Sequence, residues 1–203
     1  PLRDSVPPTE FIPVAEKIGL INQLGEWVLR TACEAAASWS SPLKVSVNVS
    51  PIQLINSSLT DTVVAILRST ELDPHRLDLE ITESDVFNEN TRSLEILSQL
   101  RELGVQISID DFGTGYSSLS RLSYFPFDKI KIARSFFINI PDQKDDLDIV
   151  RLIISMGKSL HMRIVAEGGE TEEQLQSLRK LGCDLVQGYL IGKPGPLNSP
   201  ENR

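Results

Sequence analysis

Six polar side chains recur along this chain, each at or near the carboxyl end of a β-like run. They are Asn48, Glu80, Asp110, Lys131, Glu167 and Gln187. One polar residue near a strand end is usually a solvated terminus, but six in six successive runs are not expected by chance. The carboxyl ends of parallel strands lie at one end of a sheet or barrel. The spacing therefore predicts that these side chains meet in one site.

The predicted site is rich in carboxylates. Its acids are Glu80, Asp110, Asp111 and Glu167, with Glu83 and Glu170 on the loops that follow their strands. So many acids repel one another unless cations neutralise them. Oxygen ligands without a nearby His or Cys set favour Mg²⁺ or Mn²⁺ over zinc. Two such ions are a standard arrangement for cleaving a phosphodiester with water, and Lys131 could bind phosphate or orient that water.

A glycine turn follows the paired aspartates, with Gly113 and Gly115 on either side of Thr114. Two glycines at this spacing after a strand permit a tight turn and a close approach of the backbone to a ligand. The G-x-G-x-x-G pattern of a dinucleotide-binding site is absent from the sequence, which argues against a Rossmann fold.

The elements that position these residues alternate between short apolar runs and helix-like stretches. The predicted strands are Leu43–Ser50, Arg76–Thr82, Gly104–Asp110, Phe127–Ala133, Met162–Glu167 and Asp184–Tyr189. The predicted helices are Leu24–Trp39, Leu59–Ser69, Thr91–Leu103, Leu147–Leu160 and Thr171–Leu181. For the last helix, Thr171 and Gln174 predict a capping box and Gly182 a stop. Such alternation predicts parallel strands with crossover helices, an α/β fold.

Side-chain alternation favours a barrel over an open sheet. In the run 45–49 the valines share one face, whereas Ser46 and Asn48 share the other, and later runs repeat this split. An apolar face under helices and a polar face turned inward are typical of a barrel with a functional lumen. A doubly wound open sheet tends to be apolar on both faces.

Composition excludes some functions. The 203 residues carry a formal charge of −8, which argues against binding duplex DNA or RNA. The longest apolar runs are shorter than the roughly 20 residues that span a bilayer, so we expect no membrane insertion by this domain. Cys33 and Cys183 match no metal-ligand spacing and are predicted to be buried, reduced thiols of a cytosolic protein.

The motifs resemble, in order, those of the EAL-domain family of cyclic di-GMP phosphodiesterases. The matching segments are Ser46–Ser50, Leu79–Glu83, Asp110–Ser118, Lys131–Phe136, Val165–Gly168 and Gln187–Leu190. The stretch from Phe11 to Leu29 is similar to the family's first helix region. The resemblance covers nearly the whole chain, and the Asp110–Ser118 run is very specific.

The resemblance implies a TIM-like (β/α) barrel that hydrolyses cyclic di-GMP to the linear dinucleotide with two Mg²⁺ or Mn²⁺ ions. By analogy, one ion is held by Asn48, Glu80 and Asp110, and the second by Asp110, Asp111 and Glu167. Lys131, Glu167 and Asp111 are the implied catalytic residues, with Lys131 positioning the water. Loop support or substrate binding is assigned to Glu83, Gly113, Thr114, Gly115, Glu170 and Gln187.

Three departures from the family pattern stand out. The family's first two strands, the second of which carries the Glu-Ala-Leu ligand, have no counterpart here. Residues 1–203 are therefore expected to be one N-terminally incomplete EAL domain, the C-terminal part of a larger multidomain protein. The pattern Lys-Ile-Asp ends in Ala133, which removes a carboxylate beside the second metal. Glu-Gly-Val-Glu has Gly169 in place of Val, which loses an apolar contact but no ligand.

These departures leave several functions open. The parent protein is expected to be a phosphodiesterase, with this fragment alone inactive. A catalytically degenerate domain that still binds cyclic di-GMP as a sensor is the main alternative, and Ala133 is the residue in its favour. A domain kept only for regulatory protein contacts is less favoured, because the paired aspartates and the glycine turn are intact.

The resemblance also predicts a cellular context. EAL domains commonly follow sensory or diguanylate-cyclase domains, so a bacterial signalling protein with such an upstream domain is expected. The expected location is the cytoplasm, either free or as the cytoplasmic part of a membrane-anchored protein. A homodimer remains open.

Overall fold

The structure, a computed structural model, describes residues 6–56, 58–83, 91–114, 122, 125, 127–136 and 144–195, with only the backbone of 91 and 144–146. It divides into two compact units, residues 1–78 with 90–105 and residues 79–89 with 106–203. The strands follow the order β1-β2-β3-β4-β5-β6 in one sheet, so chain order and sheet order coincide.

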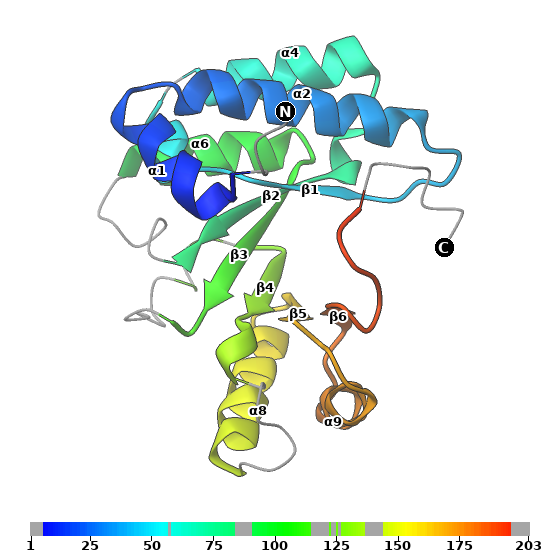
Figure 1. The fold of residues 1–203 in the computed structure, drawn as a ribbon. Helices are drawn as coiled ribbons and strands as arrows, with labels where there is room; N and C mark the ends of the chain where they lie inside the picture. The colour runs from blue at the N-terminus through cyan, green and yellow to red at the C-terminus, as the bar shows by residue number, and fades with distance from the viewer. Residues whose placement is uncertain are drawn as a thin grey trace. The chain divides into compact units, whose positions relative to one another are not determined.

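The first unit is mainly helical. Its elements are α1 (Pro8–Lys17), α2 (Ile21–Ser38), β1 (Val45–Asn48), α3 (Pro51–Ile55), α4 (Leu59–Thr70), η1 (Pro74–Arg76) and α6 (Thr91–Glu102). Helix α2 packs along α4 and against β1 (Figure 1). Helix α3, which the sequence did not predict, begins at a capping box. In that box Ser50 Oγ accepts a hydrogen bond from the Ile52 amide, and Gln53 Oε1 accepts one from the Ser50 amide.

The second unit contains the parallel strands that carry most of the predicted site. Its elements are β2 (Leu77–Thr82, of which the first two residues belong to the first unit), β3 (Gln106–Phe112), β4 (Lys129–Ile132), η2 (Arg134–Phe136), α8 (Lys144–Ser159), β5 (Arg163–Glu167), α9 (Glu172–Leu181) and β6 (Leu185–Gln187). Strands β3 to β6 pair in parallel, and α8 packs on β4 and β5 (Figure 1). The α/β prediction is confirmed.

Strands β2 to β5 are buried on both faces over most of their length, whereas β6 is partly exposed. Ile109 and Ile132 are fully buried, and so are polar residues of the opposite alternation, with Ser108 0% and Lys131 4% exposed. The polar face predicted to turn inward therefore lies away from bulk water. Buried polar groups are tolerated only where they are paired, and the pairing of Lys131 defines the site described below.

Local sequence signals set the helix ends largely as expected. Helix α9 starts with the predicted capping box, in which the Gln174 amide donates to Thr171 Oγ1, and it ends at Gly182 in the left-handed conformation. Helix α8 begins at Lys144, three residues before the predicted start. The prediction of two buried thiols is right for Cys33 and wrong for Cys183, which is partly exposed, and both are free.

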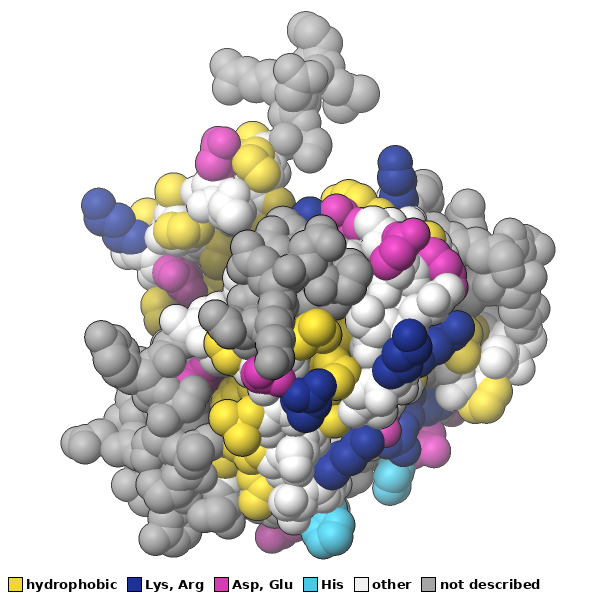
Figure 2. Space-filling view, turned by 90° about the horizontal axis from the view of Figure 1, so that it is seen from below, with side chains coloured by type: hydrophobic (Ala, Val, Ile, Leu, Met, Phe, Trp, Pro, Cys, Tyr) yellow, Lys and Arg dark blue, Asp and Glu magenta, His cyan; other side chains and the backbone are white. Residues whose placement is uncertain are grey.

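The visible surface mixes charge and apolar character. On the face shown in Figure 2, Lys and Arg side chains lie beside Asp and Glu side chains, with hydrophobic ones between them. Among the described helices, none has both the length and the apolar character needed to cross a membrane.

Candidate active site

Lys131 forms the centre of the site. It lies on β4, and its Nζ is 2.6 Å from Glu80 Oε2, 3.2 Å from Asp110 Oδ2 and 2.5 Å from Glu167 Oε1. The three carboxylates come from β2, β3 and β5, and all four residues belong to the second unit. One buried ammonium thus holds acids from three strands together.

Parallel register explains why these residues meet. Lys131 is aligned with Val165 across the β4–β5 pair, and Glu167 is the last residue of β5. On β3, Asp110 lies near the strand end, as the sequence predicted. Strand ends that point the same way carry their side chains to the same edge.

Asp111 joins the cluster through an irregularity in β3. In a regular strand, consecutive side chains point to opposite faces, so Asp110 and Asp111 would diverge. The register of β3 against β4 shifts between Ile109 and Phe112, and Asp111 has a φ of 51°. The Asp111 amide also donates to Asp110 Oδ1 at 2.9 Å. This bulge turns the second carboxylate back, as bulges near active sites often do.

Three of the acids are close enough to share one cation. Ligand oxygens of Asp110, Asp111 and Glu167 all lie within 4.8 Å of one another. This is the set that the resemblance assigns to the second ion. Its donors are hard carboxylate oxygens, which fit Mg²⁺ or Mn²⁺. The residues present therefore suit the expected metal.

The electrostatics of the cluster show an excess of negative charge. Burial and the neighbouring Asp110 raise the pKa of Asp111 above its ordinary value. Burial also raises the pKa of Glu167, against the opposing hydrogen bond from Lys131. Burial would lower the pKa of Lys131, but the charge of Glu80 and the hydrogen bonds to Glu167 and Glu80 outweigh it and raise that pKa. Lys131 stays protonated, while the acids favour an added cation.

The glycine turn is anchored to the loop after β2. The Gly113 amide donates to Glu83 Oε2 at 2.7 Å, and Glu83 is 2% exposed. Thr114 Oγ1 donates to the Asp111 carbonyl oxygen at 2.8 Å. The hydrogen bond from Gly113 to Glu83 is a contact through which Glu83 could support this loop, as predicted. Gly115, predicted to share the role, lies outside the described residues.

The loop after β5 is held by different groups. The Glu170 carboxylate accepts a hydrogen bond from Arg134 Nη2 at 2.7 Å. The Gln187 backbone carbonyl accepts from the amides of Gly168 at 2.7 Å and Gly169 at 3.1 Å. These contacts of position 187 are made by its main chain, and the role expected of the Gln187 side chain stays a prediction.

Two further predicted positions are Asn48 and Ala133. Asn48 is exposed at the end of β1 in the first unit, and its role as a metal ligand stays a prediction. Ala133 follows β4 and is 4% exposed, so no carboxylate is available at that position. Arg134 and Phe136 were not predicted as site residues, although both stand in the segment that resembles the family.

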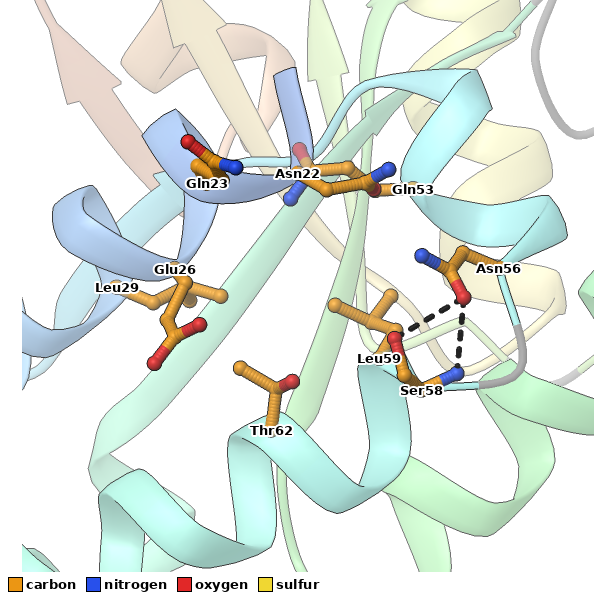
Figure 3. A pocket seen from close by; sticks show the side chains of 9 residues that line it. All are labelled: Asn22, Gln23, Glu26, Leu29, Gln53, Asn56, Ser58, Leu59 and Thr62. Carbon is orange, nitrogen blue, oxygen red and sulfur yellow. Dashed lines mark hydrogen bonds between the residues drawn. The ribbon is translucent and has the colours of Figure 1, made fainter. Parts of the chain in front are cut away.

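A separate pocket of about 110 Å³ lies in the first unit (Figure 3). Its lining includes Asn22 of α2, Gln53 of α3 and Asn56 between α3 and α4, and none of the predicted site residues. The Asn56 carboxamide oxygen accepts hydrogen bonds from both the amide and the hydroxyl of Ser58. Glu26 is the one carboxylate among the described lining residues, so the pocket does not offer the carboxylate cluster of a metal site.

Comparisons with known proteins identify the family. The chain matches the EAL domain over residues 1–194. A signalling protein of Caulobacter vibrioides is 53% identical over 98% of this chain and 25% of its own length. The Pseudomonas aeruginosa protein named bifunctional diguanylate cyclase/cyclic di-GMP phosphodiesterase MucR is 44% identical over 97% of this chain and 29% of its own length. This chain thus spans roughly a quarter of these curated relatives.

Solved structures agree with the sequence relatives. A structure of the PaMucR phosphodiesterase in a c-di-GMP complex superposes with a TM-score of 0.90 at 46% identity, over 94% of this chain and 85% of that one. The EAL domain of Mycobacterium smegmatis DcpA superposes with a TM-score of 0.82 at 40% identity, over 87% of this chain and 81% of that one. The chain belongs to the EAL-domain family.

Proposed function

We propose that the protein hydrolyses cyclic di-GMP to the linear dinucleotide with the help of Mg²⁺ or Mn²⁺. The observation that carries this is the cluster of Asp110, Asp111 and Glu167 oxygens within 4.8 Å, beside a buried lysine, in an EAL domain. Relatives at 44% and 43% identity are named as cyclic di-GMP phosphodiesterases.

The residues would divide the work of metal binding. Asp110, Asp111 and Glu167 would hold one ion, and Asp110 with Glu80 and Asn48 the other. When bound, such ions neutralise phosphate oxygens and lower the pKa of the attacking water. Asp110 would contribute to both sites, which makes it the ligand whose loss matters most.

Lys131 would orient the reactants rather than exchange protons. Its raised pKa keeps the ammonium charged, so it does not act as a base. Its three N–H groups face Glu80, Asp110 and Glu167, so it would donate to water or a phosphate oxygen by exchanging the longest of these contacts, the one to Asp110 at 3.2 Å. Its contacts with Glu80 and Glu167 fix the direction of those donors. A fixed donor costs little reorganisation when the reaction occurs.

The loop residues would keep the ligands in register. Glu83 holds the Gly113 amide two residues after Asp111, and the Gln187 carbonyl holds the Gly168 amide directly after Glu167. Glu170 is bound to Arg134 at 2.7 Å, so it would act mainly through this contact. Metal sites depend on such supporting contacts for affinity and activity.

A sensor without turnover is the second candidate, and Ala133 is the observation in its favour. If this position lacks a ligand to the second ion, the domain could bind cyclic di-GMP and leave it intact. A domain kept only for regulatory protein contacts is less favoured, because the paired aspartates Asp110 and Asp111 and the glycine turn after them are intact.

The wider protein remains a proposal as well. The relatives include a bifunctional cyclase/phosphodiesterase and a protein named oxygen sensor DosP from Escherichia coli, 41% identical to this chain. We infer a cytoplasmic signalling protein in which a sensory or diguanylate-cyclase domain accompanies this one. Two free cysteines are consistent with a reducing compartment. Homodimer formation stays open.

The test uses the intact protein with cyclic di-GMP in a Mn²⁺ titration and in chelator. Chromatography should show linear dinucleotide that appears only with the metal, and calorimetry should show weaker nucleotide binding in chelator. Tight binding without product at any Mn²⁺ concentration would establish the sensor instead. If the protein neither binds nor hydrolyses cyclic di-GMP, both the phosphodiesterase and the sensor are refuted, and a domain kept for regulatory protein contacts is left.

A further inference from the structure

Two glycines with left-handed backbone follow the candidate ligands. Gly113, with φ 95°, comes two residues after Asp111, and Gly168, with φ 81°, comes directly after Glu167. Residues with a Cβ avoid this conformation, so the two loops leave their strands by turns that favour glycine. Both glycines are also approached closely by side chains from one short turn.

That turn is η2, Arg134–Phe136, which follows β4. A Cβ placed on Gly113 would lie 2.7 Å from Phe136 Cε2 and 2.8 Å from Phe136 Cζ. A Cβ placed on Gly168 would lie 2.7 Å from both Cγ and Cδ of Arg134. The Phe136 ring and the Arg134 stem therefore lie directly on the backbones of the two loops.

Polar contacts add to this packing. Arg134 Nη2 donates to Glu170 Oε2 at 2.7 Å, so the arginine crosses Gly168 and then holds the far side of the same loop. The Phe136 amide donates to the Ala133 carbonyl oxygen at 3.2 Å, which closes the turn. One turn thus contacts the loop after β3 and the loop after β5.

We propose that the η2 turn sets the spacing between the Asp110–Asp111 pair and Glu167, with Arg134 and Phe136 as positioning residues for the metal site. The inference rests on the proposed function, since it concerns the ligands of the same ion. These ligands come from different strands, and the turn between their loops is attached to both. A shift of the loop after β5 would move Glu167 relative to the aspartates, and metal ligands tolerate little displacement.

Because the ion pair of Arg134 is exposed, removing it should affect metal binding more than folding stability. The side chains of Arg134 and Glu170 are 48% and 35% exposed, and pairs of this kind contribute little to folding. Its loss should therefore leave the melting temperature nearly unchanged. Loss of groups that orient metal ligands typically weakens metal binding about 10-fold or more.

The experiment measures Mn²⁺ binding to the intact protein by calorimetry, without cyclic di-GMP. Arg134→Ala should weaken Mn²⁺ binding roughly 10-fold. Arg134→Met keeps the stem over Gly168 and should show a smaller loss, while Arg134→Lys restores a cation and should approach wild type. Arg151→Ala removes an exposed arginine paired with Asp148 on α8 and serves as the matched control. Equal Mn²⁺ affinities for Arg134→Ala and the control would overturn the proposal.

A second measurement works without metal. Backbone hydrogen exchange should be faster at Gly168 and Gly169 in Arg134→Ala, and faster at Gly113 in Phe136→Leu, which keeps an apolar side chain to preserve folding. If wild type binds no Mn²⁺, the proposed function fails, while faster exchange at these amides would still support the holding role of the turn. Wild-type exchange in both variants would overturn that role.

Discussion

Replacing Lys131 with methionine isolates the charge at the centre of the cluster. Methionine keeps an unbranched stem but leaves Glu80, Asp110 and Glu167 without the ammonium that now lies within 3.2 Å of each. Removing one partner of a buried ion pair costs about 3 to 5 kcal/mol. The side chains of Asp110 and Glu167 remain 14% and 22% exposed, so the expected loss in chelator is at the lower end, about 3 kcal/mol.

The loss should grow with pH. In wild type, Lys131 has a folded pKa above its unfolded one, so its contribution is fully present at and below neutral pH. In Lys131→Met, Glu167 loses the hydrogen bond that opposes its raised pKa, so that pKa rises further. A folded state that binds more protons than the unfolded state loses stability as pH rises. The deficit should be smaller at about pH 5 than at about pH 8.

Urea denaturation in chelator at both pH values measures this, with the exposed Lys180→Met as control. Saturating Mn²⁺ should narrow the deficit, because bound cations replace part of the missing positive charge. A loss of unfolding free energy below about 1 kcal/mol at the higher pH is what an exposed ion pair contributes. It would show that Lys131 does not act as a buried charge that stabilises the cluster.

Three further predictions concern the metal. Ala133→Asp should raise turnover and lower the Mn²⁺ concentration for half activity, by roughly 10 to 100-fold if the carboxylate reaches the second ion; equal rates for variant and wild type in product chromatography would show that the position is silent. Asp110→Asn should reduce turnover far more than Glu170→Gln, because Asp110 is expected to serve both ions whereas Glu170 contacts Arg134; similar losses would contradict that assignment. Mn²⁺ affinity should begin to fall on acidification at a pH above the ordinary carboxyl pKa range of about 4 to 4.5. The reason is that the pKa values of Asp111 and Glu167 are raised and both carboxyl groups must lose a proton to bind the ion. An affinity that calorimetry finds constant down to that pH range would refute the prediction.

The sequence predicted the parts of the site that follow from strand periodicity. Glu80 and Lys131 lie on strands whose polar and apolar residues alternate, so their face could be derived from neighbours. Glu167 follows three apolar residues on β5, and only its place at the strand end predicted it. The end of β3 could not be derived in this way. A strict period of two places Asp111 opposite Asp110, and only the bulge with its positive φ brings them together.

Contacts between distant loops were also beyond the sequence. Gly113 was predicted as a turn glycine, and Gly168 was noted only as part of a motif. The side chains lying on them come from residues 23 and 34 positions away, Phe136 and Arg134. The local sequence pattern can predict that a turn requires glycine, but it does not predict which side chain packs against that glycine. The unpredicted helix α3 is a similar case, since its five residues are too few for a helical period to appear.

Ala133 is the residue on which the choice between a phosphodiesterase and a non-hydrolysing sensor depends, and its surroundings help to decide between them. The residue is 4% exposed, and its carbonyl closes the turn that holds both ligand loops. An aspartate there would add a fifth acid to a cluster balanced by one lysine, which raises repulsion when no ion is bound. Alanine avoids that repulsion, which would favour the metal-free fold, but if an aspartate here would reach the second ion, alanine would also weaken the binding of that ion. Asp110, Asp111 and Glu167 still lie within 4.8 Å of one another, enough for three ligands to one ion. We infer that alanine at this position raises the metal concentration needed for the proposed activity, with the three-ligand set retained.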